Sequence, residues 1–472
     1  MSDMNAVPDI LCGLRVCHFL KHAPWLWWRR ELWKLHYLAE PVDTLDEFWS
    51  HSWRLSAWTK YVNVLFLKHT LPACLMSLLF AAVAYVLFLM GLLPEWTQGP
   101  YPCSWCSFSA AGAYVLTMLF CRRHARVFLD VACIKQDDPV LKAQGLLSLG
   151  AWLKRSKSLL VLWDPSFTLR LWCAFEFGAF LYSHPKDAKL TVVPPLQGAI
   201  CLGSQLTVAA ALALSHMGKD LEMLKNVILA VVFFPCAILL THGLRAYWRS
   251  IEVMKHQAAV FSFEKAQCDC CERGRHEGGL CDKDIIGKCV IAWFGSIESF
   301  ENRVRMEMQV ALAYQLAHAA FSYHRMVAAM IPWLWLQMDL SASHDGEWTM
   351  WTRWVELSRA VTIMFGIYPC TMKLLCHTTF LLRAKYCRTY VDLLLSAVAA
   401  ASHLYAATWL ITLEEYIVWF LVDHSHGPVY GAVISWFMWS IVTLLLWKCL
   451  PVLHCMSRVQ HQPVPVRCVP DC

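Results

Sequence analysis

The stretch VFLDVACIKQDDPVLKAQGLLSLGAWLKRSKSLLVLWDPSFTLRLWCAFEFGAFLYS, residues 127–183, decides how the rest of the chain is interpreted. It holds two short apolar runs, 127–130 and 159–163, and each precedes a segment with helical periodicity. Buried strands spaced about 30 residues apart are typical of a parallel pair joined by a right-handed helical crossover. The stretch therefore predicts a soluble strand-helix-strand-helix unit.

Local signals place the ends of these elements. Asp138 can cap the first helix, with Pro139 at its first position, where the N–H that proline lacks would be unpaired anyway. The sequence Asp164-Pro165-Ser166 predicts a turn after the second strand. Residues 190–193 predict a third strand.

Composition places this unit in a membrane protein. The chain has 472 residues, of which 58% are hydrophobic and 16% charged, too apolar for a soluble protein of this length. A membrane span needs about 20 mainly apolar residues. We expect about eight spans, of which the second and fifth are short: 70–93, 107–121, 196–215, 226–243, 326–340, 355–376, 390–412 and 428–450.

Basic residues predict the orientation of the spans. They gather after every second span, at Arg122, Arg123, Arg126, Arg245, Arg249, Arg383, Lys385, Arg388 and Lys448. By the positive-inside rule, the chain is an integral, multi-pass membrane protein with both termini and both long loops in the cytosol. Lys219, Lys225 and Arg353 depart from this pattern. The net charge of +6 follows from the basic flanks, so the bilayer is an expected partner and nucleic acid is not.

The N-terminal segment, 1–45, is also expected in the cytosol. Its stretch WLWWRRELWKLHYL, residues 25–38, mixes aromatic and basic side chains, which suits a helix lying among lipid headgroups. A helix packed on the cytosolic unit fits the same residues.

The motif Arg170-Leu171-Trp172-Cys173-Ala174-Phe175-Glu176, with the preceding runs VFLD and LLVLW, resembles the Toll/interleukin-1 receptor (TIR) family. The resemblance implies a cytosolic, flavodoxin-like α/β domain that self-associates in signalling. In that family the first strand closely precedes the second, and nothing in 107–126 supplies it. Residues 46–54, DEFWSHSWR, look like the opening strand and its polar loop. The domain is then split into 46–60 and 122–195, with a membrane hairpin, 61–121, inserted between its first two strands.

The same resemblance implies a site. In enzymatic TIR members the helix-start glutamate supports cleavage of the nicotinamide–ribose bond of NAD, and here that residue is Glu176. A carboxylate near the ribose can stabilise an oxocarbenium-like transition state. Further candidates that would bind the NAD substrate at the strand ends are Ser50, His51, Asp130, Trp172 and Cys173. Alternatively, Glu176 joins a local network with Arg170 or the backbone, as in members that only assemble.

Cysteines mark two further places. Cys268, Cys270, Cys271, His276 and Cys281 lie within a short polar stretch of the second cytosolic loop, 244–325, and a structural zinc ion would anchor that loop. Reduced, solvated cysteines are the alternative. A helix over 297–324 is expected to pack on the α/β unit or the membrane. Cys103 and Cys106 form a CxxC motif in an outer loop, either inert or oxidised to a small bridge.

The remaining expected segments are the membrane hairpins 196–243, 326–382 and 383–450 and a cytosolic tail, 451–472. Two functions follow. The first is a membrane-anchored TIR-like signalling protein that acts by assembly and hydrolyses NAD. The alternative is a channel or transporter in which the α/β unit is a regulatory module.

Overall fold

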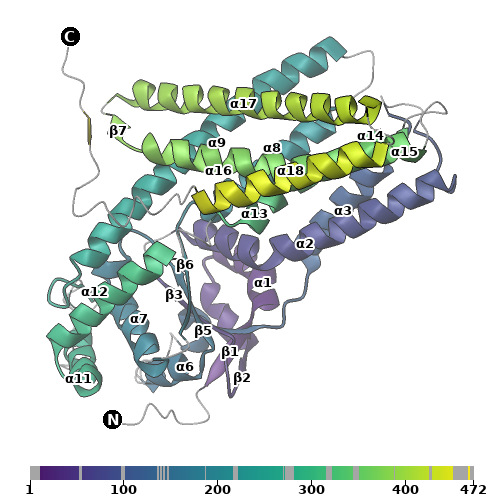
Figure 1. Cartoon of the computed structure of the whole chain (residues 1–472). Coiled ribbons are helices and arrows are strands. Elements are labelled where there is room, and N and C mark those ends of the chain that lie inside the picture. Colours follow the sequence, from purple (N-terminus) through teal and green to yellow (C-terminus); the bar gives the residue numbers. More distant parts are fainter. Residues whose placement is uncertain are drawn as a thin grey trace. The chain divides into compact units, whose positions relative to one another are not determined.

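A computed structural model describes most of the chain (Figure 1). It describes residues 11–52, 56–96, 101–135, 138, 141, 144–145, 148–185, 188–215, 222–268, 271, 281–314, 321–343, 350–386, 388–424, 428–449 and 466–467. The chain divides into two compact units. Unit 1 comprises Met1–Leu65, Arg122–Gln197 and Ser250–Ala320, and unit 2 comprises Phe66–Cys121, Gly198–Arg249 and Phe321–Cys472.

Unit 1 is built on a six-stranded sheet with the order β2-β1-β4-β3-β5-β6. Its strands are β1 (Cys12–Arg15), β2 (Ala39–Pro41), β3 (Glu47–His51), β4 (Arg126–Phe128), β5 (Ser158–Leu162) and β6 (Lys189–Val193). The strands β4, β3, β5 and β6 are mutually parallel, whereas β1 runs antiparallel to both β2 and β4. The expected strands over 159–163 and 190–193 are therefore present, within one residue at each end.

The strand that the sequence predicts within 46–54 is β3, and it lies in the middle of this sheet. Phe48 lies opposite Phe128 of β4 on one side and Leu159 of β5 on the other. Residues Phe66–Cys121 of unit 2 come between β3 and β4 in the sequence. The sheet of unit 1 is thus interrupted in the chain by membrane-type helices.

Helices cover both faces of the sheet. Successive side chains of a strand point to opposite faces, so neighbouring apolar residues of β3 need a helix on each face to be buried. On one face Phe48 stacks on Phe128, with ring centroids 4.3 Å apart, and Phe128 contacts Trp152 of α6 (Leu149–Arg155). On the other face Trp49 packs edge-on against Phe19 of α1 (Val16–Trp28). Figure 1 shows the sheet between these helices.

Four further short elements complete this part of unit 1. They are η2 (Leu32–Leu38), α4 (Asp130–Cys133), η3 (Phe167–Leu169) and α7 (Leu171–Ser183). Asp130 was expected to end a strand, but β4 ends at Phe128 and Asp130 begins α4. The Asp138 carboxylate accepts the N–H of Leu141, as a helix cap does.

The second long loop also belongs to unit 1. It contributes α11 (Asp282–Phe294) and α12 (Ile297–Tyr314), which lies within the helix expected over 297–324. Phe300 and Val304 of α12 pack against Gly178 of α7. Of the two partners expected for this helix, the α/β unit is therefore one that it contacts.

Unit 2 consists mainly of helices. They are α3 (Trp105–Phe120), α8 (Gln197–Ser215), α13 (Tyr323–Ala329), α14 (Ile331–Ser343), α15 (Met350–Thr362), the π-helical turn η7 (Ile363–Ile367), α16 (Tyr368–Leu381), α17 (Thr389–His424) and α18 (Pro428–Cys449), together with most of α2 (Ala57–Leu89) and α9 (Glu222–Ala259). A short pair of strands, β7 (Lys385–Tyr386) and β8 (Val466–Arg467), completes its described part.

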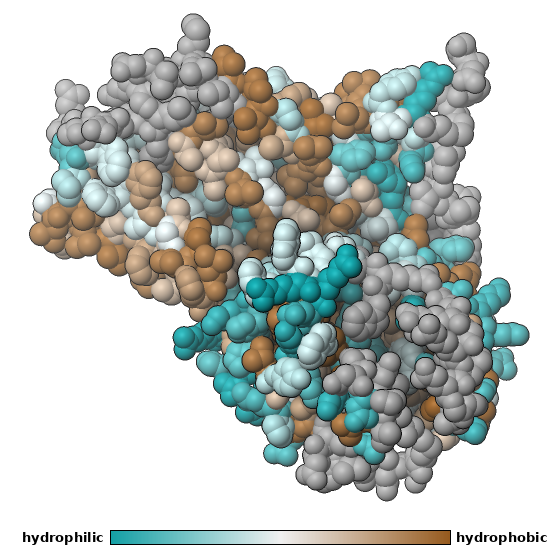
Figure 2. All heavy atoms as spheres, turned by 180° about the vertical axis from the view of Figure 1, so that it is seen from behind, coloured by the Kyte–Doolittle hydropathy of each residue, from teal (hydrophilic) through white to brown (hydrophobic). Residues whose placement is uncertain are grey.

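Six helices of the described chain are long and apolar enough to cross a membrane. They cover Ala57–Leu89, Gln197–Leu214, Val231–Ala259, Met350–Leu381, Thr389–Val422 and Tyr430–Lys448. The second and fifth of the eight expected spans correspond to α3 and α14, with 16 and 13 residues. At 1.5 Å per residue, these helices are about 24 and 20 Å long, less than the ~30 Å hydrocarbon core. Figure 2 shows apolar side chains gathered over unit 2 and hydrophilic ones over unit 1.

Candidate active site at the strand edge

Five of the residues predicted for the NAD site lie at the carboxyl ends of the parallel strands of unit 1, which we call the strand edge: Ser50, His51, Asp130, Cys173 and Glu176. Ser50 is the fourth residue of β3 and is fully buried. Its hydroxyl donates a hydrogen bond of 2.5 Å to Oε2 of Glu176, in the second turn of α7. This contact joins residues 126 positions apart in the sequence. Glu176 as a whole residue is half-buried.

Burial changes the protonation of this carboxyl. Desolvation raises the pKa of Glu176 from its usual 4.5 to about 8, and the nearby Asp130 charge raises it further, while the Ser50 hydrogen bond acts in the opposite direction. The neutral acid is therefore the main form of Glu176 at pH 7. Active-site carboxyls often have raised pKa values of this kind, although structural networks produce them too.

His51 and Asp130 lie beside this pair. The His51 Nε2 atom is 3.8 Å from Oδ1 of Asp130. Burial lowers the pKa of His51 to about 4, and the positive charge of Lys60 lowers it too, against the opposing effect of Asp130. His51 is consequently a neutral imidazole at pH 7, next to Asp130.

The neighbouring residues Cys173 and Trp172 make contacts in different places. The Cys173 thiol is buried and donates to the carbonyl oxygen of His51 at 3.5 Å, which places it at the strand edge. The Trp172 indole N–H instead donates to Asp282 of α11 at 3.0 Å. The alternative expectation was a local network of Glu176 with Arg170 or the backbone. The Arg170 backbone forms a β-bridge with Gln267, and the Glu176 carboxyl accepts a hydrogen bond from Ser50.

Besides Lys60, sequence reasoning missed three polar residues at this edge, Asp164, Ser166 and Ser52. The Asp164 carboxylate accepts hydrogen bonds from the Ser166 N–H and hydroxyl, and Ser166 Oγ lies 2.6 Å from Ser52 Oγ. Among the described residues, the other Asp164 oxygen is buried without a hydrogen-bond partner. The available signal was the position of Asp164 two residues after β5, which the turn pattern Asp-Pro-Ser obscured.

Three of the cysteines predicted to bind metal come together. The thiols of Cys268, Cys271 and Cys281 lie within 4.8 Å of one another, and the Cys271 and Cys281 sulfurs are 3.4 Å apart. This arrangement can hold a metal ion. Cys270 and His276 lie outside the described residues.

This cysteine cluster adjoins the start of α7. The neighbouring Gln267 pairs with the chain there, because its N–H donates to Leu169 and its carbonyl accepts from the Leu171 N–H. The cluster and the helix that carries Glu176 are therefore connected through the backbone of residue 267.

No protein-family model matches this chain, and no curated protein or solved structure matches it either.

Proposed function

We propose that this chain is a membrane-anchored, TIR-like signalling protein whose unit 1 self-associates and hydrolyses NAD with Glu176 as the catalytic residue. The observation that carries the proposal is the hydrogen bond between Ser50 and Glu176 at the strand edge. It brings the two segments that resemble the TIR family into one site.

The topology of the sheet supports this assignment. In chain order, the parallel strands β3, β4, β5 and β6 have the spatial arrangement 2-1-3-4, which is that of flavodoxin-like sheets. Ligands of such sheets bind beyond the carboxyl ends of the strands where the order reverses. Ser50 and His51 of β3 and Asp164 after β5 flank that point.

The chemistry follows from the carboxyl group. Water adds to C1′ of the ribose, the bond from C1′ to the nicotinamide nitrogen breaks, and neutral nicotinamide leaves while a proton is released. The ionised form of Glu176 can hydrogen-bond the ribose hydroxyls and stabilise the developing positive charge. The positive nicotinamide ring favours that ionised form in the complex. We therefore expect the rate at low substrate to rise with pH towards about 8, where free Glu176 ionises.

The test is NAD consumption by the full chain in nanodiscs, measured as nicotinamide release at increasing protein density. Glu176→Gln should lower the rate by about 100-fold, typical for loss of a group that stabilises transition-state charge. Glu47→Gln is the matched control, because Glu47 begins the same strand and receives the Trp49 indole N–H at the opposite end. Equal rates for the wild type and Glu176→Gln would refute the enzymatic proposal.

A structural zinc ion at Cys268, Cys271 and Cys281 is part of the same proposal. Thiolates at this spacing suit zinc, and the metal would hold the backbone of Gln267, next to Cys268, against the start of α7. Metal analysis should find one zinc equivalent fewer in Cys281→Ser. An unchanged zinc content would remove this part of the proposal.

A channel or transporter is the second candidate, and the buried charges of unit 2 favour it. Arg359 pairs with the fully buried Glu414, and Arg245 pairs with Asp392 at 2.6 Å. Ionisable groups inside membrane bundles often line ion or solute pathways. Flux of ions into liposomes that Glu414→Gln abolishes would support this candidate over the first.

A further inference from the structure

Unit 2 contains a second cluster of metal-binding groups, formed by Cys103, Cys106 and Asp339. The side chains of all three are fully buried. Their two sulfurs and a carboxylate oxygen lie within 4.8 Å of one another. Cys103 and Cys106 flank the start of α3, and Asp339 lies near the end of α14.

We propose that Cys103, Cys106 and Asp339 bind a zinc ion that fastens α3 to α14. Zinc bonds of about 2.3 Å to sulfur and 2.0–2.2 Å to oxygen place neighbouring tetrahedral ligands roughly 3.5–4 Å apart. The Cys103 sulfur is 3.3 Å from Oδ1 of Asp339, so a small outward movement of the ligands makes room for the ion.

The surrounding hydrogen bonds hold the carboxylate in position for this task. Asp339 accepts the backbone N–H of Cys106 through Oδ1 and that of Ser107 through Oδ2, each at 2.9 Å. Such outer contacts orient a metal ligand. The N-terminus of α3 also carries partial positive charge. That charge offsets the single net negative charge of Zn²⁺ with two thiolates and one carboxylate.

Binding would exchange the two thiol protons for the ion. These protons are released to solvent, so zinc affinity should fall as pH is lowered. Three protein ligands leave one position of the tetrahedral shell for water or for Ser343, whose hydroxyl accepts the Cys103 N–H at 2.9 Å. Cys and Asp ligands around a closed, buried position suit zinc better than magnesium or calcium, which prefer oxygen ligands alone.

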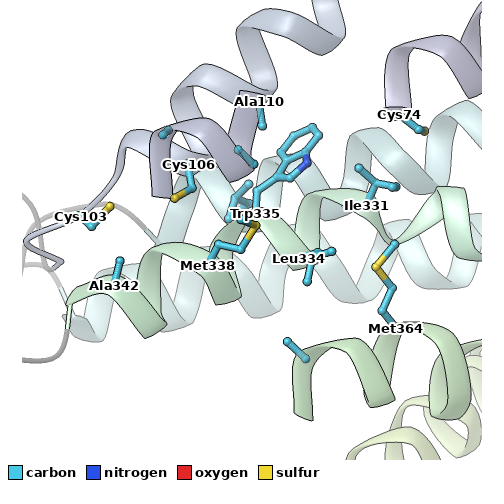
Figure 3. Packing of buried hydrophobic residues seen from close by; sticks show 14 of the residues in the cluster. Cys74, Cys103, Cys106, Ala110, Ile331, Leu334, Trp335, Met338, Ala342 and Met364 are labelled. Carbon is cyan, nitrogen blue, oxygen red and sulfur yellow. The ribbon is translucent and has the colours of Figure 1, made fainter. Parts of the chain in front are cut away.

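The structural role follows from the length of the two helices. Both α3 and α14 are shorter than the ~30 Å hydrocarbon core, and they meet at this cluster. Figure 3 shows Cys103 and Cys106 at one end of an apolar cluster that includes Trp335 and Met338. A zinc ion at that end would cross-link two helices that have little length with which to anchor themselves.

The test is the zinc content of the purified full chain in nanodiscs after dialysis with a weak chelator. The double variant Cys103→Ser/Cys106→Ser should lose one equivalent relative to wild type. Asp339→Asn should weaken zinc binding at least tenfold, the usual cost of losing a ligand or its support. Cys74→Ser is the matched control and should keep all its zinc, because Cys74 is a buried cysteine of the same apolar cluster but contacts Gln205 and Ala328.

A second readout follows the metal itself. Cobalt added to metal-free wild-type protein should give thiolate-to-cobalt charge-transfer absorption, with part of it lost in the double variant and part in Cys281→Ser. The double variant and Cys281→Ser thus report separately on the site at Cys103, Cys106 and Asp339 and on the site at Cys268, Cys271 and Cys281. Failure of one proposal therefore does not affect the other. An unchanged zinc content in the double variant would overturn the proposal. A mass two hydrogens below the dithiol form, located to Cys103 and Cys106, would also overturn it, because these residues would then form a disulfide.

Discussion

At the scale of single residues, Glu176 combines a raised pKa with a contact to the strand edge. Its carboxyl receives the Ser50 hydroxyl at 2.5 Å, and burial raises its pKa to about 8. Because folding shifts the pKa upward, the neutral acid is the form that the folded state prefers. The neutral carboxyl of Glu176 therefore contributes to the stability of the folded state. This stability is fully present below pH 4.5, the usual pKa of the group, and is lost as pH rises through about 8.

We therefore expect Glu176→Gln to stabilise unit 1 at alkaline pH. The amide fills the same space without a charge that burial penalises, so the variant should melt at a higher temperature than wild type at pH 9. At pH 4 the two proteins should melt at nearly the same temperature, since the wild-type carboxyl is then mainly neutral in both the folded and the unfolded state. Thermal unfolding followed by tryptophan fluorescence across this range is the measurement. The same difference in melting temperature between the two proteins at both pH values would contradict the assigned pKa.

Part of this site could be predicted from the sequence, and part could not. The segments that carry Ser50 and Glu176 were identifiable because a strand pattern and a helix start mark them. Lys60 and Asp164 were not identifiable as site residues. Lys60 precedes a long apolar run, so in the sequence it looks like a basic residue that flanks a membrane span. Asp164 belongs to a common turn pattern, Asp-Pro-Ser. Their positions at the strand edge depend on the tertiary fold.

At the scale of elements, the contact of α7 with α12 depends on a missing side chain. A Cβ atom at Gly178 would lie 2.4 Å from Phe300 Cε2 and 3.2 Å from Val304 Cγ2. No side chain tolerates the shorter distance without displacing the aromatic ring. The glycine therefore sets how closely the two helices approach.

Gly178→Ala should destabilise the protein by about 1–3 kcal/mol, the usual cost of overpacking a well-filled contact. Phe300→Leu should restore part of that loss in the double variant, because it removes the clashing atoms. Gly112→Ala is the control, since nothing lies within 4 Å of a Cβ atom there. Chemical unfolding of each variant measures the effect. Additive losses in the double variant would show that Gly178 and Phe300 do not clash.

The helices of unit 2 share a buried ion-pair network. Arg359 of α15 contacts two successive residues of α17, Glu414 at 3.1 Å and Glu415 at 3.5 Å. The Glu414 side chain is 0% exposed and also accepts the Ser435 hydroxyl, whereas that of Glu415 is 54% exposed. The two glutamates therefore form a natural comparison between a buried and an exposed partner of one cation.

Glu414→Gln should lower the free energy of unfolding by about 3 kcal/mol. This is the low end for a broken buried pair, because Glu356 still pairs with Arg359. Glu415→Gln should cost less than about 1 kcal/mol, as exposed pairs do. Unfolding in detergent gives both values. Equal losses would mean that burial does not decide the strength of these pairs.

At the scale of the whole molecule, the sheet of unit 1 is assembled from strands that precede and follow the apolar helices α2 and α3 in the sequence. The charge pattern of the sequence predicts both segments on one side of the membrane, and the missing first strand predicts where to look for it. β3 lies between β4 and β5, as that argument expects. The antiparallel strands β1 and β2 were not predicted, because the N-terminal segment gives stronger signals for a helix than for strands of three or four residues.

The split sheet is the central claim, and one ion pair allows a direct test. Asp46, just before β3, and Lys157, just before β5, lie 2.8 Å apart, and both side chains are exposed. A carbodiimide joins a carboxylate and an amine that touch, without a spacer. Treatment of the full chain in nanodiscs, followed by peptide mass spectrometry, should find an isopeptide bond between these residues. Lys157→Arg should abolish it, because a guanidinium does not form this bond. If the pair Glu31–Lys34, 2.8 Å apart, becomes linked while Asp46 links only elsewhere or not at all, β3 does not belong to this sheet.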